Sequence, residues 1–194
     1  ASNFGNFYSI AVVSLFIDFL PMLPIQILLS NLLSDLPLIS IVTDKVDLDE
    51  LKKPKAYHLR SVLPLIINLA IIITIFDFVF FSVFFREAPS TIQTLWFIES
   101  VFCELLLVFI IRTKHLFWKA ERPSFALMLS IISVFIVSIA LPFSEFGQKF
   151  FHFTAPGISQ LLLMSLILIC FTAVSETVKL IYFHYWKPKD SVVS

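Results

Sequence analysis

Long runs of apolar residues, separated by short polar stretches, dominate the chain. Four of these runs cover residues 62–85, 92–111, 125–143 and 158–183, and each contains at most two charged side chains. A helix needs about 20 apolar residues to cross the roughly 30 Å hydrocarbon core of a bilayer. The pattern therefore predicts four transmembrane helices between residues 62 and 183.

The first 42 residues are also mostly apolar, but they contain two closely spaced prolines. Pro21 and Pro24 remove two backbone donors and interrupt a continuous helix. The segment therefore predicts a hairpin of two spans, over about residues 3–20 and 24–42. The predicted fold class is an all-α membrane protein, a bundle of six transmembrane helices.

The distribution of basic residues supports an even number of spans. Six spans place residues 43–61, residues 112–124 and the C-terminal end on one side, and these carry twelve of the fourteen Lys and Arg residues. Loops rich in Lys and Arg face the cytoplasm. We therefore expect both termini in the cytoplasm, with residues 187–194 as a cytoplasmic tail. Five spans would lose this asymmetry.

Composition narrows the possible functions. Hydrophobic residues make up 58% of the chain and charged residues 14%, whereas about 25% of residues are charged in soluble proteins. The net charge is zero, which excludes the broad basic face that nucleic-acid binding requires. The sequence has no G-x-x-x-x-G-K-[ST], G-x-S-x-G or H-E-x-x-H motif, so this chain has no catalytic site of those types.

Polar residues in the second predicted span form the first candidate site. Asn31 and Asp35 are four residues apart and share a helix face, with Ser34 beside them. Pro37 cannot donate a hydrogen bond to the carbonyl of Leu33, which predicts that the span is broken near Pro37. Carbonyl, amide and carboxylate oxygens together are ligands that Mg²⁺ and Ca²⁺ prefer. Alternatively, these side chains form only hydrogen bonds between helices.

Other polar residues lie at comparable depth. Asn3 and Asn6 share a face of the first span, and a rise of ~1.5 Å per residue places Asn6 about 18 Å, and Asp35 about 16 Å, from the turn that joins the two spans. The two side chains can therefore meet near the middle of the membrane. For Glu99 two roles are possible, as a metal ligand or as a packing residue. Asp77 is expected to make a structural polar contact.

These stretches resemble the C-terminal membrane domain of P-type cation-transporting ATPases, especially the bacterial magnesium-transporting branch. The Pro-x-x-Pro approach and the Asn-Leu-x-x-Asp pattern of the second span are the most specific features. The resemblance covers residues 1–113 well, and residues 114–194 agree in span number and topology. The matching stretches are residues 2–6, 19–26, 31–35, 46–54, 75–77 and 96–99, followed by Arg112 and Thr113.

The resemblance implies that residues 1–186 are a transmembrane cation-transport domain, equivalent to helices five to ten of such a pump. Asn6 stands where calcium pumps carry Glu, which favours a single divalent site and Mg²⁺ as the transported ion. ATP would be used only through domains absent from this chain. The metal-site residues that the resemblance implies are Asn3, Asn6, Asn31, Ser34, Asp35 and Glu99.

The implied setting is an integral protein of the bacterial plasma membrane. Its partners would be the lipid bilayer, a divalent cation, and the remaining domains and first four helices of the parent pump. Two alternatives stay open: the same domain in a Ca²⁺ or monovalent-cation pump, or a stand-alone, non-enzymatic binding or scaffold protein derived from a pump. The chain begins at Ala1 without an initiator Met, which favours a piece of a longer protein.

Overall fold

Helices joined by short connections form the whole described structure. The computed structural model describes residues 2–44, 59–113, 115–117 and 121–185, and the side chains of residues 2–7, 59–62 and 185 are not described. No strand occurs among these residues. The elements are α1 (Ser2–Val13), α2 (Pro24–Ser40), η1 (Ile41–Thr43), α4 (Leu59–Phe84), α5 (Pro89–Ile111), α6 (Phe125–Ala140), η3 (Leu141–Phe143), α7 (Glu145–Phe151) and α8 (Ile158–Tyr185).

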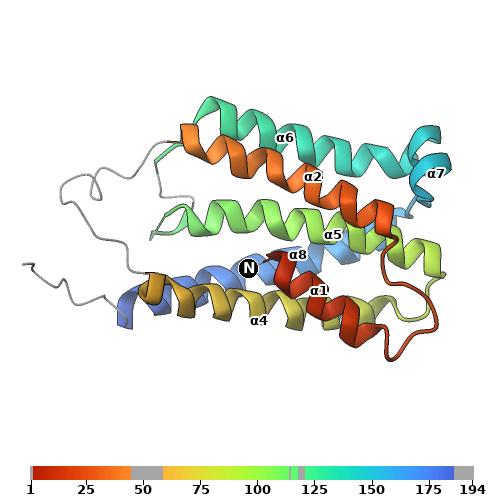
Figure 1. Ribbon diagram of the computed structural model, residues 1–194, viewed down its shortest axis with the longest axis horizontal. Helices are drawn as coiled ribbons and strands as arrows, with labels where there is room; N and C mark the ends of the chain where they lie inside the picture. The colour runs from red at the N-terminus through yellow and green to blue at the C-terminus, as the bar shows by residue number, and fades with distance from the viewer. Residues whose placement is uncertain (1, 45–58, 114, 118–120, 186–194) are drawn as a thin grey trace, which may run out of the picture.

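Successive long helices run in opposite directions. In Figure 1, α1, α4 and α6 run from left to right, and α2, α5 and α8 return. The connections at residues 14–23, 85–88 and 144–157 therefore lie at one end of the bundle, and the described residues between α5 and α6 (112, 113, 115–117 and 121–124) lie at the other. This alternation agrees with the predicted order of spans. Which end faces the cytoplasm stays a prediction.

The described residues contain five helices that are long and apolar enough to cross a membrane, where the sequence predicted six. The helix that falls short is α1, which has 12 residues. It ends at Val13, whereas the predicted span reached residue 20. The reason is that the backbone forms tight turns after Val13. Phe16 donates its backbone N–H to the Val13 carbonyl at 2.9 Å, and the Ser14 hydroxyl donates to the Ile10 carbonyl at 2.7 Å. The Phe16 bond spans three residues, as in a 3-10 turn, and such turns are frequent at helix ends.

The predicted break near Pro37 is wrong. Helix α2 continues through Pro37 to Ser40 and passes into the short 3-10 helix η1. The Ile41 N–H then bonds the carbonyls of Pro37 and Ile39. A proline removes one intrahelical hydrogen bond, whereas a full break would leave several backbone groups unpaired in an environment without water. Pro64 likewise lies inside α4.

Polar contacts hold three helix ends together at the connection between α5 and α6. Arg112, which follows α5, forms an ion pair with Asp44 at 2.8 Å and donates to the Glu121 carbonyl at 2.8 Å. The second carboxylate oxygen of Asp44 accepts the backbone N–H of Ser124 at 2.8 Å. The end of η1, the end of α5 and the start of α6 are therefore fixed to one another.

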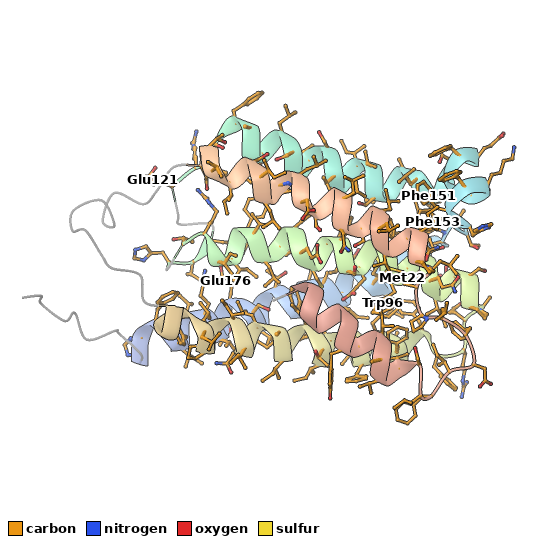
Figure 2. The ribbon with its side chains drawn as sticks, in the orientation of Figure 1. Met22, Trp96, Glu121, Phe151, Phe153 and Glu176 are labelled. Carbon is orange, nitrogen blue, oxygen red and sulfur yellow. The ribbon has the colours of Figure 1, made fainter. Side chains whose placement is uncertain are left out.

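Buried Lys179 anchors α8 at the same end of the bundle, where its partner Glu176 lies (Figure 2). The spacing of Glu176 and Lys179 predicts a local ion pair, and the structure confirms it. Lys179 also donates to the carbonyls of Ile110 at 3.0 Å and His115 at 2.7 Å, and Glu176 accepts the Phe117 N–H at 2.8 Å. The pair thus anchors α8 to the end of α5 and the segment that follows it.

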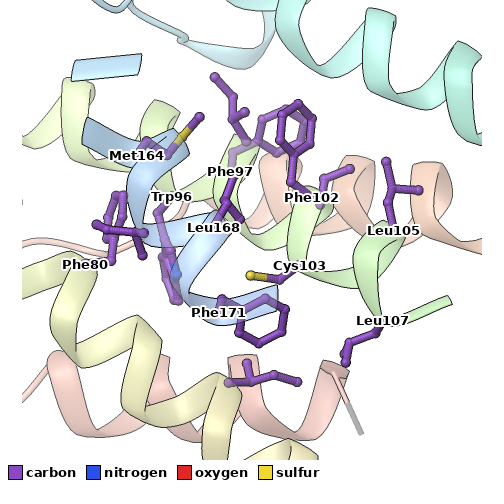
Figure 3. Packing of buried hydrophobic residues seen from close by; sticks show 14 of the residues in the cluster. Phe80, Trp96, Phe97, Phe102, Cys103, Leu105, Leu107, Met164, Leu168 and Phe171 are labelled. Carbon is purple, nitrogen blue, oxygen red and sulfur yellow. The ribbon is translucent and has the colours of Figure 1, made fainter. Parts of the chain in front are cut away.

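Helix α5 is the centre of the bundle. It packs against α1, α2, α4, α6 and α8. Within the apolar 18-residue stretch of each candidate span, the buried share is 83% for α5 and 28% for each of the other four. Trp96, Phe97 and Phe102 of α5 meet Phe171 and Met164 of α8 and Phe80 of α4 in one apolar core (Figure 3). The outer helices therefore present most of their apolar surface to lipid.

At the opposite end, α7 packs closely against η3. A Cβ atom at Gly147 would lie 1.9 Å from the Leu141 carbonyl oxygen, so only glycine fits. Ser144 caps the helix by accepting the Gly147 N–H at 2.9 Å. The short helix is therefore held in one position at the end of α6.

Replacing Lys179 should destabilise the protein much more than replacing Lys149. A Lys179→Met change leaves the buried Glu176 carboxylate uncompensated and should lower the free energy of unfolding by about 3–5 kcal/mol. Lys149 pairs with Glu145 on an exposed surface at 3.1 Å. Lys149→Met should therefore change the free energy of unfolding by less than about 0.5 kcal/mol. Denaturation in mixed micelles measures both, and equal losses would contradict the anchoring role.

Gly147→Ala should destabilise α7 by overpacking. We expect a loss of about 1–3 kcal/mol, because the added methyl group would collide with backbone rather than with a movable side chain. Gly157→Ala is the matched control, since its Cβ would lie 3.6 Å from the nearest atom, in the Gln160 side chain. Thermal unfolding in detergent compares the two. A neutral Gly147→Ala would mean that α7 is free to shift.

Candidate functional site

Helix α2 carries two of its three candidate ligands, Asn31 and Asp35, on the side that faces away from the bundle. Asp35 is exposed and Asn31 is half-buried. A rotation of 100° per residue places Asp35 roughly opposite the packed face of the helix. That face contacts α5 and α6. Its buried residues are Gln26, Ser30, Leu33, Ser34 and Pro37.

The three candidates of α2 therefore divide between two faces. Asn31 and Asp35 share the outward face, as their spacing predicts. Ser34 points inward and is buried, and its hydroxyl donates to the backbone carbonyl of Asn31 at 3.2 Å. Ser34 thus contacts the backbone of this pair, and its side chain does not lie on the same surface.

The predicted approach of Asn6 to Asp35 stays a prediction. The side chains of Asn3 and Asn6 are outside the described part of the chain. Their helix, α1, packs mainly against α4, whereas α2 packs against α5 and α6. The two helices of the predicted hairpin thus have different principal neighbours.

Glu99 lies inside the bundle, with 1% of its surface exposed. One carboxylate oxygen accepts the Cys103 thiol at 3.2 Å, and the other, Oε2, has no hydrogen-bond partner among the described residues. The charged side chain that acts on Glu99 through its electrostatic field is Asp77 of α4. Because Asp35 is exposed, the structure does not place the two predicted carboxylate ligands on a common surface.

Asp77 makes the structural contact that its position predicts, and it does so with two partners. Its Oδ1 accepts the indole N–H of Trp96 at 3.0 Å, and its Oδ2 accepts the hydroxyl of Ser9. All three side chains are buried, and they come from α4, α5 and α1. A carboxylate at membrane depth costs about 2.5–3.5 kcal/mol on insertion scales, so this pairing has a clear physical reason.

Sequence reasoning missed Ser9 and Trp96 as partners. Trp96 stands near the start of its span, which favours an interfacial position, yet it is fully buried in the apolar core (Figure 3). Ser9 is one of several serines in apolar runs. No local signal distinguishes either residue, because each partner is contributed by a different helix.

The donors available for a cation on the outward face of α2 are few. Within the described ranges there is no group of three or more His, Cys, Asp and Glu side chains that could hold a metal ion. The outward face offers the Asp35 carboxylate and the Asn31 amide. This set suits an ion that keeps water ligands, as Mg²⁺ does, more than one that requires a full protein cage.

Comparison with known families identifies most of the chain. Residues 19–181 match the family described as "Cation transporting ATPase, C-terminus". The match includes α2, α4, α5, α6, α7 and most of α8.

Curated bacterial relatives are similar over most of the chain. "Magnesium-transporting ATPase, P-type 1" of Escherichia coli K12 is 37% identical over 156 residues, which are 76% of this chain and 17% of that protein. A Salmonella typhimurium protein of the same name (strain 14028s) is 33% identical over 190 residues, 94% of this chain and 21% of the relative. The chain therefore spans about a fifth of the length of these relatives.

Breaking either hydrogen bond to Asp77 should weaken the contact between the helices involved. Ser9→Ala should reduce the free energy of unfolding by about 0.6 kcal/mol, and by no more than about 1.7 kcal/mol, the range of interhelical bonds in membranes. In an Asp77→Asn background the same change should cost less, since the acceptor has lost its charge. A double-mutant cycle in detergent measures this coupling. Full additivity would show that the charge of Asp77 adds nothing to the Ser9 bond.

Proposed function

Because the chain belongs to the family of cation-transporting P-type ATPases, as their C-terminal membrane domain, we propose that it forms the part of an ATP-driven pump through which Mg²⁺ crosses the membrane. The observation that carries this proposal is the position of Asn31 and Asp35 on the outward face of a membrane helix. A carboxylate in that position requires a partner, because hydrocarbon does not solvate charge.

The remainder of the pump is the source of that partner. In the described bundle the outward face of α2 is left uncovered by α5 and α6, which pack on its other side. We infer that helices preceding this chain in the parent pump cover this face and complete the site. Asp35 would supply the negative charge and Asn31 a neutral oxygen. Asn3 and Asn6 of α1 would add two further amides.

Ser34 and Glu99 have supporting parts in this proposal. The Ser34 hydroxyl bonds the backbone of Asn31 and so helps to hold that residue on the outward face. Glu99 retains one carboxylate oxygen without a hydrogen-bond partner among the described residues. It would act from inside the bundle, as a second carboxylate on the central helix α5.

The identity of the ion rests on ligand chemistry and on the relatives. Mg²⁺ dehydrates reluctantly and is usually bound by one or two carboxylates together with several waters. A site with amides and few carboxylates meets this preference. The similar bacterial proteins are named as magnesium-transporting ATPases.

Energy would reach this domain from outside the chain. ATP binding and phosphorylation of an aspartate would occur in other domains of the pump, and the site would open alternately to the two sides of the membrane. Residues 43–60, of which 45–58 are outside the described residues, would connect these domains to the bundle. The excess of Lys and Arg supports a cytoplasmic location for that connection and for both termini in a bacterial cell.

A chimaeric pump tests the proposal. The corresponding C-terminal part of the E. coli magnesium-transporting ATPase is replaced by this chain and expressed in cells that lack their own Mg²⁺ uptake systems. We expect growth at low Mg²⁺. Asp35→Asn should reduce Mg²⁺ uptake about tenfold or more, since each ~1.4 kcal/mol of lost binding energy is tenfold in affinity.

Asp18→Asn is the matched control, because Asp18 is also an exposed aspartate but lies in the connection between α1 and α2. It should leave uptake unchanged. Undiminished uptake by the Asp35→Asn chimaera would overturn the assigned site. Uptake of Ca²⁺ or a monovalent cation in place of Mg²⁺ would overturn the assigned ion and support the alternative pumps.

A further inference from the structure

Three exposed phenylalanines lie in η3 and α7, the segments that follow α6, and together they are called the aromatic patch. Phe143, Phe146 and Phe150 expose 51%, 61% and 56% of their surface. The rings of Phe146 and Phe150 are stacked, with centroids 5.4 Å apart and planes inclined by 8°. Large apolar side chains that are gathered on one exposed surface mark a contact with a partner or a membrane.

The side chains of α7 divide into three sectors around the helix. Gly147 and Phe151 face the bundle, and the aromatic patch lies beside them. Glu145 and Lys149 occupy a polar sector, where they form an exposed ion pair at 3.1 Å. A short helix with an apolar side and a charged side is typical of segments that lie in the plane of a membrane surface.

The position of α7 is fixed rather than adaptable. Gly147 lies against the Leu141 carbonyl, and the Gln148 side chain donates to the Pro142 carbonyl at 3.0 Å. His152 ends the helix in the left-handed conformation, with φ of 56°. The aromatic patch is therefore presented outward by a rigid support.

The aromatic patch is continuous with the outer surface of a transmembrane helix. Helix α6 is a candidate span whose apolar stretch is only 28% buried. Its exposed residues include Ile132, Phe135 and Ile136. Phe143 follows directly after that helix, in η3. The apolar surface that α6 presents to lipid therefore extends onto α7 at the end of the span.

On the inner side, the aromatic patch is connected to the core. Phe146 and Phe150 contact Phe151, which packs on Phe153, and Phe153 packs on Phe97 of the central helix at 4.7 Å. The Phe151 carbonyl also accepts the side-chain N–H of Gln26, in the first turn of α2, at 2.9 Å. Phe151 and Phe153 lie together at this end of the bundle (Figure 2).

We propose that α7 is an interfacial helix that binds the phospholipid leaflet at this end of the bundle. Phe143, Phe146 and Phe150 enter the boundary between head groups and acyl chains. Lys149, in the neighbouring sector, reaches the phosphate groups, as long basic side chains do at membrane interfaces. The occupant of the aromatic patch is thus phospholipid, and the contact holds both the end of α6 and the start of α2 at a defined depth.

Site-specific photocrosslinking tests this placement without depending on transport. The full-length protein that carries this chain is reconstituted into phosphatidylethanolamine and phosphatidylglycerol vesicles, with p-benzoylphenylalanine in place of Phe146 or Phe150. The replacement keeps an aromatic ring on an exposed position, so the fold should be retained. Replacement of Glu145, in the polar sector of the same helix, is the matched control.

We expect phospholipid adducts on the peptide that contains position 146 or 150, with a yield several-fold higher than at position 145. Absence of lipid adducts would overturn the proposal, because the aromatic patch would then face water. Crosslinks to another polypeptide would overturn it in favour of a protein partner. Equal lipid adducts at positions 145 and 146 would contradict a helix that lies in the interface with one side toward the lipid.

Discussion

The absence of water in the hydrocarbon core is the constraint on which this structure depends. Every polar group at that depth must find its partner within the protein, and the bundle is arranged so that most of them do. Asp77 is the clearest case, because it accepts hydrogen bonds from Ser9 and Trp96 and thereby joins three helices. The central position of α5 follows the same logic, since its polar side chains are enclosed by neighbouring helices.

The two faces of α2 show how the same constraint relates to function. On the packed face, the hydroxyls of Ser30 and Ser100 approach to 3.4 Å, and Gln26 bonds the Phe151 carbonyl. On the outward face, Asp35 is exposed on a membrane helix. The polar side chains of α2 thus have hydrogen-bond partners on the packed side, whereas a carboxylate is exposed on the other. This arrangement suits a domain that completes its site together with the rest of a pump.

The two ends of the bundle are held by different chemistry. At one end, ion pairs with backbone contacts fix the helices, through Arg112 with Asp44 and Lys179 with Glu176. At the other, a close backbone approach at Gly147 and a series of aromatic contacts position α7. The charged contacts lie on the side rich in Lys and Arg, and the aromatic contacts lie on the side poor in them. Which of these two ends faces the cytoplasm stays a prediction.

Span length and composition made the architecture predictable from the sequence. Apolar runs of about 20 residues and the side preference of Lys and Arg depend only on local composition, so the all-helical membrane fold and the order of its spans could be derived directly. The spacing of Asn31 and Asp35 likewise fixed their common face, since helical periodicity is local. The continuity of α2 through Pro37 was predicted incorrectly, because local proline rules do not include the high cost of unpaired backbone inside a bilayer. Helix α1 ends at Val13, before the predicted end of its span, because tight backbone turns follow that residue. Only the tertiary structure decided that Asp35 faces outward, that Ser34 and Glu99 face inward, and that Asp77 meets Ser9, 68 residues away. Each of these outcomes depends on which helices are neighbours, and that choice is made by packing over the whole bundle rather than by any short segment of the chain.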